Sequence, residues 1–165
     1  RQREYKGKLD GLKMCYIGDG NNMANSLIVG GLKTGMSVSV ACPENYHPAA
    51  TTLAFAKKYD CFELTDDPIK AAKDADVIFT DVWASMGEED KAAERIALLR
   101  PYQVNKEMLE MTGKDTTVVM HCLPAVKGHE ITEDVFEHYA DVIFDEAENR
   151  MHTIKAVMVA TLGEY

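Results

Sequence analysis

The sequence predicts a doubly wound α/β domain, with a mainly parallel sheet and helices on both faces. Short apolar runs alternate about five times with helical segments along the 165 residues. The runs are apolar throughout, as parallel strands buried on both faces are, and the helical segments supply the crossovers that such strands need. Because the chain shows no internal repeat and no low-complexity segment, we predict one domain over residues 1–165.

The first strand and helix are predicted from a turn and an apolar stripe. Residues 14–17 form an apolar run that ends in a Gly-Asp-Gly turn at residues 18–20. Apolar or small residues then recur at i, i+3, i+4, i+7 and i+8 from Ala24, which is the spacing of a helix that packs on one side. Gly35 follows where such a helix needs a left-handed stop.

The later elements follow the same alternation. Asp67-Pro68 pairs a residue that caps a helix with one that fits the first turn, so a short helix is expected there. The further strands are expected at residues 37–41, 61–64, 77–80, 117–120 and 142–144, and the further helices at residues 48–58, 67–73, 88–99, 105–110 and 145–162. The last helix is apolar on nearly every face over residues 156–162, and a helix of this kind expects partners on several sides.

The charge argues against a nucleic-acid binder. Lys and Arg number 18 against 27 Asp and Glu, a net charge of −9, whereas affinity for nucleic acid rests on basic residues that neutralise phosphates. Residues 1–13 hold five basic and two acidic side chains, and we interpret this basic leader as a solvated entry or linker segment rather than as a nucleic-acid-binding arm. No apolar stretch reaches about 18 residues, so no membrane span is expected. We expect a cytoplasmic protein, or a mitochondrial matrix protein if the source is eukaryotic.

Four cysteines are spread along the chain, at Cys15, Cys42, Cys61 and Cys122. None forms a C-x-x-C pair, and three lie in or beside expected strands. This pattern favours free thiols in a reducing compartment over a disulfide framework.

In doubly wound sheets, ligands bind beyond the carboxyl ends of the strands. Four expected strand exits carry polar residues, at residues 18–22, 81–87, 121–124 and 145–150. The first resembles a dinucleotide fingerprint, but Met23 stands where the third glycine belongs, and no acidic residue ends the second strand. Asn21 and Asn22 instead offer amides at a helix start, either for a small polar ligand or as a helix cap.

The second and fourth exits each place a charge at the expected site. Asp81 follows a strand, either as a turn residue or as a fixed negative charge for a ligand ammonium group. Trp83 is interpreted as a core residue. Arg150 lies near the start of the last helix, where the helix dipole disfavours a cation. Its charge is compensated either by the neighbouring Glu146 and Glu148 or by a ligand anion.

At the third exit His121 adjoins Cys122, a pair that raises the question of a metal or a nucleophile. Adjacent side chains on an extended segment point to opposite sides, and no further ligands follow at zinc-like spacing. We therefore expect no metal and no Cys–His nucleophile here. The remaining interpretation is that His121 and Cys122 make polar contacts to a substrate.

Taken together and in order, the four exits closely resemble the ornithine-binding, C-terminal domain of ornithine carbamoyltransferases. The matching segments are Gly-Asp-Gly-Asn-Asn at 18–22, Asp-x-Trp-x-Ser-Met-Gly at 81–87, His-Cys-Leu-Pro at 121–124 and Glu-Ala-Glu-Asn-Arg at 146–150. The resemblance covers almost the whole chain and implies a Rossmann-like domain that needs no cofactor and no metal. The Ser-Met-Gly loop favours ornithine, because aspartate-specific members lack it and putrescine-type relatives usually differ there.

The resemblance also implies a reaction, in which the neutral δ-amine of ornithine attacks carbamoyl phosphate and gives citrulline and phosphate. Four matched residues would hold the α-amino and α-carboxylate groups of ornithine: Asn22, Asp81, Ser85 and Met86. On the carbamoyl phosphate side, Cys122 would lie beside the reacting amine, and His121 and Arg150 would polarise the carbamoyl oxygen. The Leu123 carbonyl would accept from the carbamoyl amide, with a cis Leu123–Pro124 bond as a further hypothesis.

One departure from the family is large. The Ser-x-Arg-Thr-Arg motif of the carbamoyl phosphate domain is absent from the sequence. We therefore expect that domain to be missing and this chain alone to make no citrulline. The implied partners are the missing N-terminal domain and further copies of the full-length protein, since full-length members are homo-oligomers, often trimers. The alternatives are a putrescine- or other amine-specific carbamoyltransferase domain and a non-catalytic amino-acid-binding module.

Overall fold

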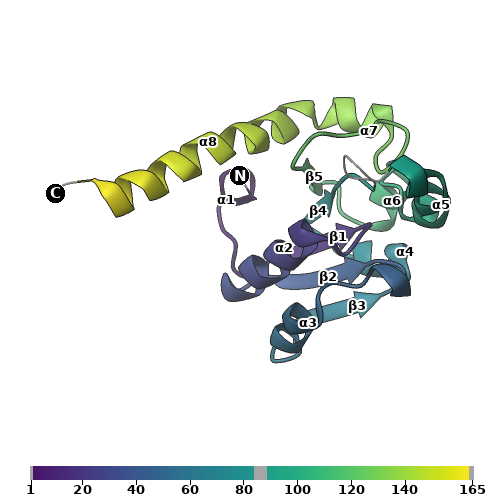
Figure 1. Cartoon of the computed structure of the whole chain (residues 1–165), viewed down its shortest axis with the longest axis horizontal. Helices are drawn as coiled ribbons and strands as arrows, with labels where there is room; N and C mark the ends of the chain where they lie inside the picture. The colour runs from purple at the N-terminus through teal and green to yellow at the C-terminus, as the bar shows by residue number, and fades with distance from the viewer. Residues whose placement is uncertain (1, 84–88, 164–165) are drawn as a thin grey trace.

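A parallel five-stranded sheet forms the centre of the computed structural model, which describes residues 2–83 and 89–163 (Figure 1). The strand order is β3-β2-β1-β4-β5, and all four pairs are parallel. The strands are β1 (Lys13–Ile17), β2 (Ser37–Ala41), β3 (Phe62–Thr65), β4 (Val77–Thr80) and β5 (Val118–His121). The order reverses between β1 and β4, so the doubly wound prediction is confirmed.

Helices connect the strands and cover the sheet. They are α1 (Gln2–Lys6), α2 (Asn22–Lys33), α3 (Ala50–Ala56), α4 (Pro68–Ala72), α5 (Glu89–Leu99), α6 (Lys106–Met111), α7 (Glu133–His138) and α8 (Ala140–Leu162), with 3₁₀ turns at Glu44–Tyr46 and Arg100–Tyr102. The predicted cap of α4 is confirmed, because Asp67 Oδ1 accepts hydrogen bonds from the backbone of Ile69 and Lys70, both at 3.0 Å.

The sheet is buried on both faces, each against its own hydrophobic cluster. Along β1, Met14 and Tyr16 belong to one cluster, with residues of α2 and α3, while Cys15 and Ile17 belong to the other, with residues of α4, α6 and α7. Successive side chains of a strand point to opposite faces, so both sets must be apolar. All four cysteines are free thiols, as their spacing predicts.

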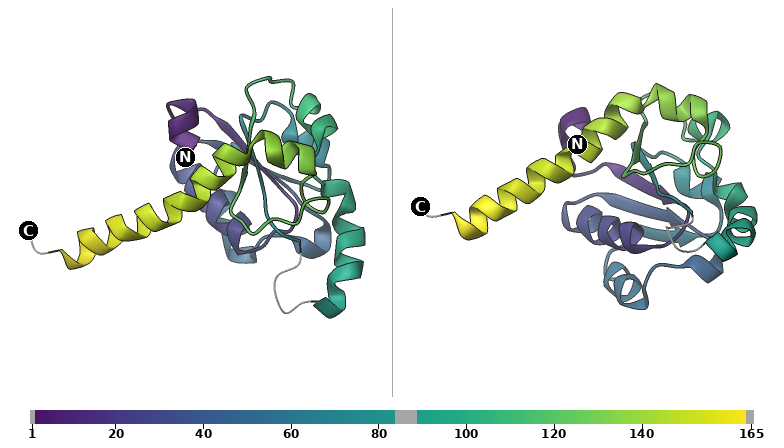
Figure 2. Two further views of the ribbon diagram at one scale, coloured as in Figure 1. Left: turned by 90° about the horizontal axis from the view of Figure 1, so that it is seen from above. Right: turned by 45° about the horizontal axis from the view of Figure 1, so that its top comes forward.

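The predicted strand at residues 142–144 is wrong, because these residues lie in the first turns of α8. Ile143 is fully buried, whereas Phe144 is 56% exposed, so the apolar run has one buried face and not the two of a central strand. A run of three apolar residues fits either element, and the contact of α8 with β5 decides it here. The fourth polar segment therefore lies within a helix, and the end of α8 projects from the domain (Figure 2).

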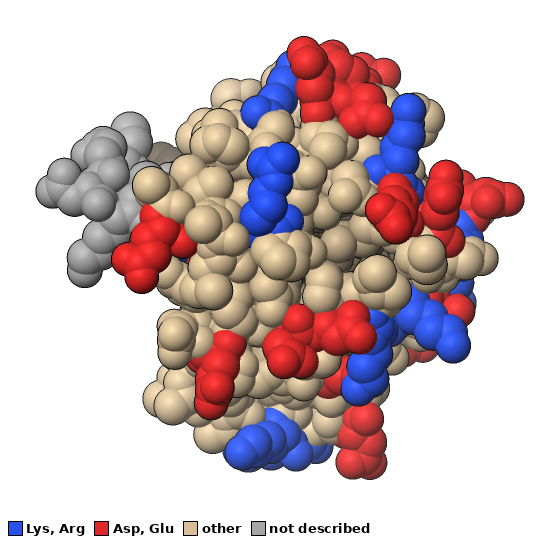
Figure 3. All heavy atoms as spheres, turned by 90° about the vertical axis from the view of Figure 1, so that its right-hand side faces the viewer, with Lys and Arg blue, Asp and Glu red and all other residues tan. Residues whose placement is uncertain are grey.

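Acidic and basic side chains are interspersed over the face shown in Figure 3, and neither sign of charge forms a continuous patch on that face. Within the described ranges, no helix is long and apolar enough to cross a membrane.

Gly20, at the start of the first βα connection, has no room for a side chain. A Cβ there would lie 2.5 Å from the backbone nitrogen of Pro48 and 2.7 Å from the carbonyl carbon of His47. We expect Gly20→Ala to lower the free energy of unfolding by about 1–3 kcal/mol, because backbone atoms would have to move. Gly30→Ala is the control, since a Cβ there meets nothing within 4 Å, and it should raise the free energy of unfolding by about 0.5–1 kcal/mol. Urea denaturation of both variants measures this, and equal effects would contradict the close approach.

Candidate functional site

The carboxyl ends of β1, β4 and β5 meet the middle of α8 around a cavity of about 750 Å³. It is lined by Asn22, Met23, Asp81, Cys122, Leu123, Glu146, Ala147, Asn149, Arg150 and Thr153. Parallel strands end at the same edge of a sheet, which is why polar residues far apart in sequence converge here. Of the predicted site residues, Ser85 and Met86 lie outside the described residues.

Asp81 is the most tightly held polar residue of the cavity. It is only 7% exposed, and its carboxylate accepts three hydrogen bonds, from Asn21 Nδ2 (2.8 Å), the Val82 backbone (2.9 Å) and Cys122 Sγ (3.1 Å). These donors come from the ends of three strands. The carboxylate therefore has a fixed orientation before any ligand arrives.

Asn21 acts as the cap of α2. Its Oδ1 accepts from the backbone of Met23 at 2.9 Å and Ala24 at 3.3 Å, which leaves Nδ2 to donate to Asp81. Of the two uses considered for this amide pair, Asn21 takes the structural one. Asn22 is exposed and lines the cavity, where it is open to a ligand.

Cys122 is a protonated thiol that donates a hydrogen bond to the Asp81 carboxylate. Burial raises the pKa of this thiol far above its usual range, and the hydrogen bond to Asp81 and the nearby charges of Asp81 and Glu146 raise it further. The thiolate is the reactive form of cysteine, so Cys122 is suited to holding a neighbouring group rather than to attacking it.

His121 is fully buried, and both of its ring nitrogens are engaged within the protein. Nδ1 accepts from the Leu123 backbone at 2.9 Å, and Nε2 lies 3.1 Å from Glu130 Oε1. To polarise a substrate oxygen, as the sequence predicts, the ring would have to release one of these partners. The structure does contain the predicted cis peptide bond between Leu123 and Pro124.

The expectation that adjacency keeps the His121 and Cys122 ligand atoms apart is wrong. One ligand atom from each of these residues and one from Asp81 lie within 4.8 Å of one another. The chain leaves β5 after His121, so Cys122 is no longer held in the strand's alternation. Each of the three residues already has a hydrogen-bond partner, and a metal ion would have to displace such bonds.

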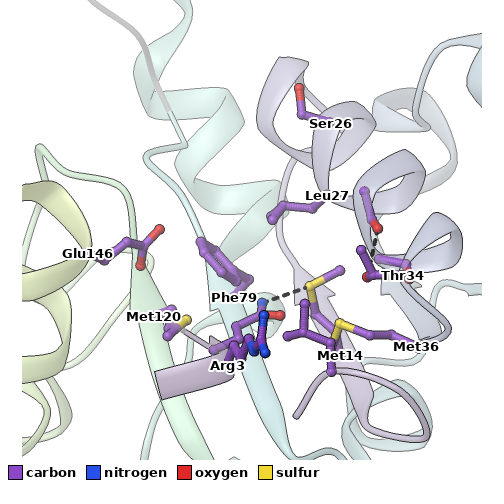
Figure 4. Close-up of a pocket in the computed structure, with 13 residues that line it drawn as sticks. Arg3, Met14, Ser26, Leu27, Thr34, Met36, Phe79, Met120 and Glu146 are labelled. Atoms are coloured by element: carbon purple, nitrogen blue, oxygen red, sulfur yellow. Dashed lines mark hydrogen bonds between the residues drawn. The ribbon is translucent and has the colours of Figure 1, made fainter. Parts of the chain in front are cut away.

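The sequence indicates Glu146 only as an ion-pair partner of Arg150, whereas the structure places it as the second acidic residue of the cavity lining. Burial raises its pKa to about 7, and the charge of Asp81 adds to this, while a hydrogen bond from the His121 backbone opposes it. Its Oε2 is buried and has no hydrogen-bond partner in the part of the chain that the structure describes. Glu146 also borders a neighbouring, mostly apolar cavity of about 360 Å³ (Figure 4), where Phe79 and Met120 approach it from the sheet.

Arg150 is exposed at the mouth of the cavity, one turn after Glu146. Among the described residues it has no ion-pair partner, and the nearby Glu148 pairs with His152 at 2.8 Å. The guanidinium is therefore open to a ligand anion. Trp83 is a core residue, 1% exposed, as the sequence predicts.

The raised pKa of Glu146 predicts a pH-dependent stability. The folded state holds its proton up to about pH 7, whereas an unfolded glutamate releases it near 4.5. Folding stability should therefore fall as the pH rises through this window. We expect Glu146→Gln, which stays neutral, to be about 1–2 kcal/mol more stable than wild type near pH 8 and to lose this advantage below about pH 5.

Urea denaturation at the two pH values measures this difference. Glu110→Gln is the control, because Glu110 is exposed on α6, and its stability relative to wild type should not depend on pH. An advantage of Glu146→Gln that is the same at both pH values would contradict the shifted pKa.

Comparisons with known proteins show the family to which the chain belongs. Residues 10–161 match the family model described as aspartate/ornithine carbamoyltransferase, Asp/Orn binding domain. The ornithine carbamoyltransferase of Pseudothermotoga lettingae is 55% identical over 97% of this chain and 53% of that protein. The catabolic ornithine carbamoyltransferase of Bacillus cereus is 48% identical over 98% of this chain and 54% of that protein.

A solved structure of the ornithine carbamoyltransferase from Pyrococcus furiosus superimposes with a TM-score of 0.89 at 46% identity, over 99% of this chain and 53% of that one. The chain thus spans about half the length of the relatives that it matches. The match to the family model extends over most of the chain. The chain belongs to the aspartate/ornithine carbamoyltransferase family and represents its Asp/Orn-binding domain.

Proposed function

We propose that this chain is the second-substrate half of an ornithine carbamoyltransferase and binds L-ornithine in the 750 Å³ cavity. The observation that carries the proposal is Asp81, a buried carboxylate at the meeting point of three strand ends. A fixed and buried carboxylate binds an ammonium group more strongly than one in open solvent does. The names of the relatives point to the same substrate.

In the proposed reaction, the δ-nitrogen of ornithine forms a bond to the carbamoyl carbon, and the bond from that carbon to the phosphate oxygen breaks. The δ-ammonium group first loses one proton to solvent, and the second proton, which the nitrogen loses as the new bond forms, leaves with the phosphate or to solvent. Asp81 and Asn22 hold the amino-acid end of ornithine, together with Ser85 and Met86. The Cys122 thiol lies beside the reacting amine and positions it.

The carbamoyl side of the site is proposed around α8 and the 122–124 loop. Arg150, open at the cavity mouth, polarises the carbamoyl oxygen, where negative charge develops in the transition state. The Leu123 carbonyl accepts from the carbamoyl amide. His121 shares the polarising role only if its ring leaves Leu123 or Glu130.

Calorimetry with L-ornithine, with and without carbamoyl phosphate, tests the substrate. We expect Asp81→Asn to weaken ornithine binding by about 10- to 100-fold, because it removes a charge-assisted contact. Asp141→Asn, on the exposed start of α8, is the matched control and should bind as wild type does. Unchanged affinity in Asp81→Asn would refute its role. Stronger binding of putrescine would favour an amine-specific relative, and no response to any of these ligands would favour a non-catalytic module.

The chain is proposed to need a second, carbamoyl phosphate-binding domain, and the end of α8 is the proposed contact. Large apolar side chains on this part of the helix are exposed: Met151, Ile154, Val157, Met158, Val159 and Leu162. An exposed apolar surface of this kind marks an interaction site. The full-length protein is further proposed to be a homo-oligomer.

Hydrogen exchange tests this contact. In the chain alone, amides 151–162 should exchange fast, because all the residues of this part of the helix are exposed in the described structure. The amides of β1 and β4 should be protected and serve as the internal reference. In protein that also carries the proposed carbamoyl phosphate-binding domain, exchange of the 151–162 amides should slow. Full protection through Leu162 in a monomer of this chain alone would contradict the proposal.

A further inference from the structure

The loop that lines the cavity after β5 is closed at its base by one buried carboxylate. Glu130 is fully buried. Its Oε1 accepts from the Val126 backbone at 2.7 Å and lies 3.1 Å from His121 Nε2. Glu130 Oε1 thus connects His121, the last residue of β5, to Val126 in the loop that follows. Glu130 Oε2 has no hydrogen-bond partner within the described ranges, so the two contacts of Oε1 account for the side-chain bonds of Glu130.

These contacts fix the protonation of His121. The Leu123 backbone N–H donates to Nδ1 at 2.9 Å, so Nδ1 must present a lone pair. The ring hydrogen is therefore on Nε2, where it donates to Glu130 Oε1. His121 is a neutral connector between Glu130 and Leu123, in the way that a carboxylate orients a functional imidazole elsewhere.

His121 bonds to Leu123, a residue whose backbone conformation is unfavourable on its own. Leu123 has a φ of 57°, in the left-handed region that is unfavourable for a residue with a Cβ. Its backbone N–H is held by His121, and Leu123 and Cys122 both line the cavity. Such conformations persist only when the surroundings fix them.

We propose that Glu130 is a positioning residue, which through His121 holds Leu123 and Cys122 in place at the cavity. This inference rests on the proposed function, in which the Leu123 carbonyl receives the carbamoyl amide and the Cys122 thiol adjoins the reacting amine. Glu130 itself touches neither substrate. It acts by keeping the imidazole in one tautomer and one orientation, so that the loop presents the same geometry in every turnover.

Two variants of similar size separate the hydrogen-bonding role of Glu130 from its volume. Glu130→Gln keeps one oxygen that can accept both N–H groups, whereas Glu130→Met keeps the length without an acceptor. In nitrogen NMR of this chain with labelled histidine, wild type and Glu130→Gln should show His121 as a single tautomer with its hydrogen on Nε2. Glu130→Met should show a mixture of tautomers and faster exchange of the Leu123 amide.

Glu137→Gln is the matched control. Glu137 forms an ion pair with Lys127 of the same loop but is exposed, so its loss should leave the His121 tautomer unchanged. If Glu130→Met does not fold, Glu130→Asp takes its place with the same expectation, because a carboxylate one methylene shorter cannot reach both donors.

Steady-state kinetics supply the second readout, on protein that also carries the proposed carbamoyl phosphate-binding domain. Glu130→Met should lower kcat/KM for carbamoyl phosphate by about 10- to 100-fold, as a displaced catalytic group does. Glu130→Gln and Glu137→Gln should stay near wild type. A wild-type tautomer in Glu130→Met, or an altered tautomer with unchanged kcat/KM, would overturn the inference. Absence of turnover and of ornithine binding in wild type would instead show that the proposed function fails, and the inference would fall with it.

Discussion

The hydrogen bonds that the Asp81 carboxylate accepts are the interactions on which the rest of the site depends. It accepts bonds from Asn21, which caps α2, from the backbone just after β4, and from Cys122 just after β5. A buried carboxylate is costly unless its oxygens are bonded, so the three segments are constrained to converge on it. The same bonds keep Cys122 protonated and orient Asn21 for its cap. The start of α2, the Asp81 carboxylate and the Cys122 thiol are therefore held together by one set of hydrogen bonds.

The cavity holds two acids whose surroundings differ. Asp81 accepts three hydrogen bonds, whereas Glu146 is half-buried, has one buried oxygen without a partner among the described residues, and has a pKa of about 7. Divergent surroundings of this kind let neighbouring groups carry different charges at one pH. A cation that enters the cavity meets the Asp81 carboxylate and, in Glu146, a second carboxyl group that ionises more readily when a positive charge is near.

Helix α8 connects the site to the surface. Its first turns pack Ile143 into the core, the next turns bring Glu146 and Arg150 to the cavity, and its end exposes apolar side chains away from the domain (Figure 2). A shift of this helix would move both charged residues relative to Asp81. Contact between the exposed end and a second domain would thus be felt at the cavity.

Much of the fold could be predicted from the sequence because local patterns decide it. The apolar runs of β2 and β4 were predicted at their observed bounds, and the Asp67 cap follows from residue chemistry alone. Residues 142–144 were misassigned, since three apolar residues fit a strand or one face of a helix, and only the packing of Ile143 distinguishes them.

The candidate site divides in the same way. The sequence alone determined the polar segments at the strand ends and their family resemblance, because these depend on residue identity and order. Only the tertiary structure decided that Asn21 is a cap bonded to Asp81, that His121 is held between Leu123 and Glu130, and that Glu146 is the second acid of the cavity. Those assignments depend on which hydrogen-bond partner each polar atom meets after burial. That choice is made between residues up to 60 positions apart, and no local pattern encodes it.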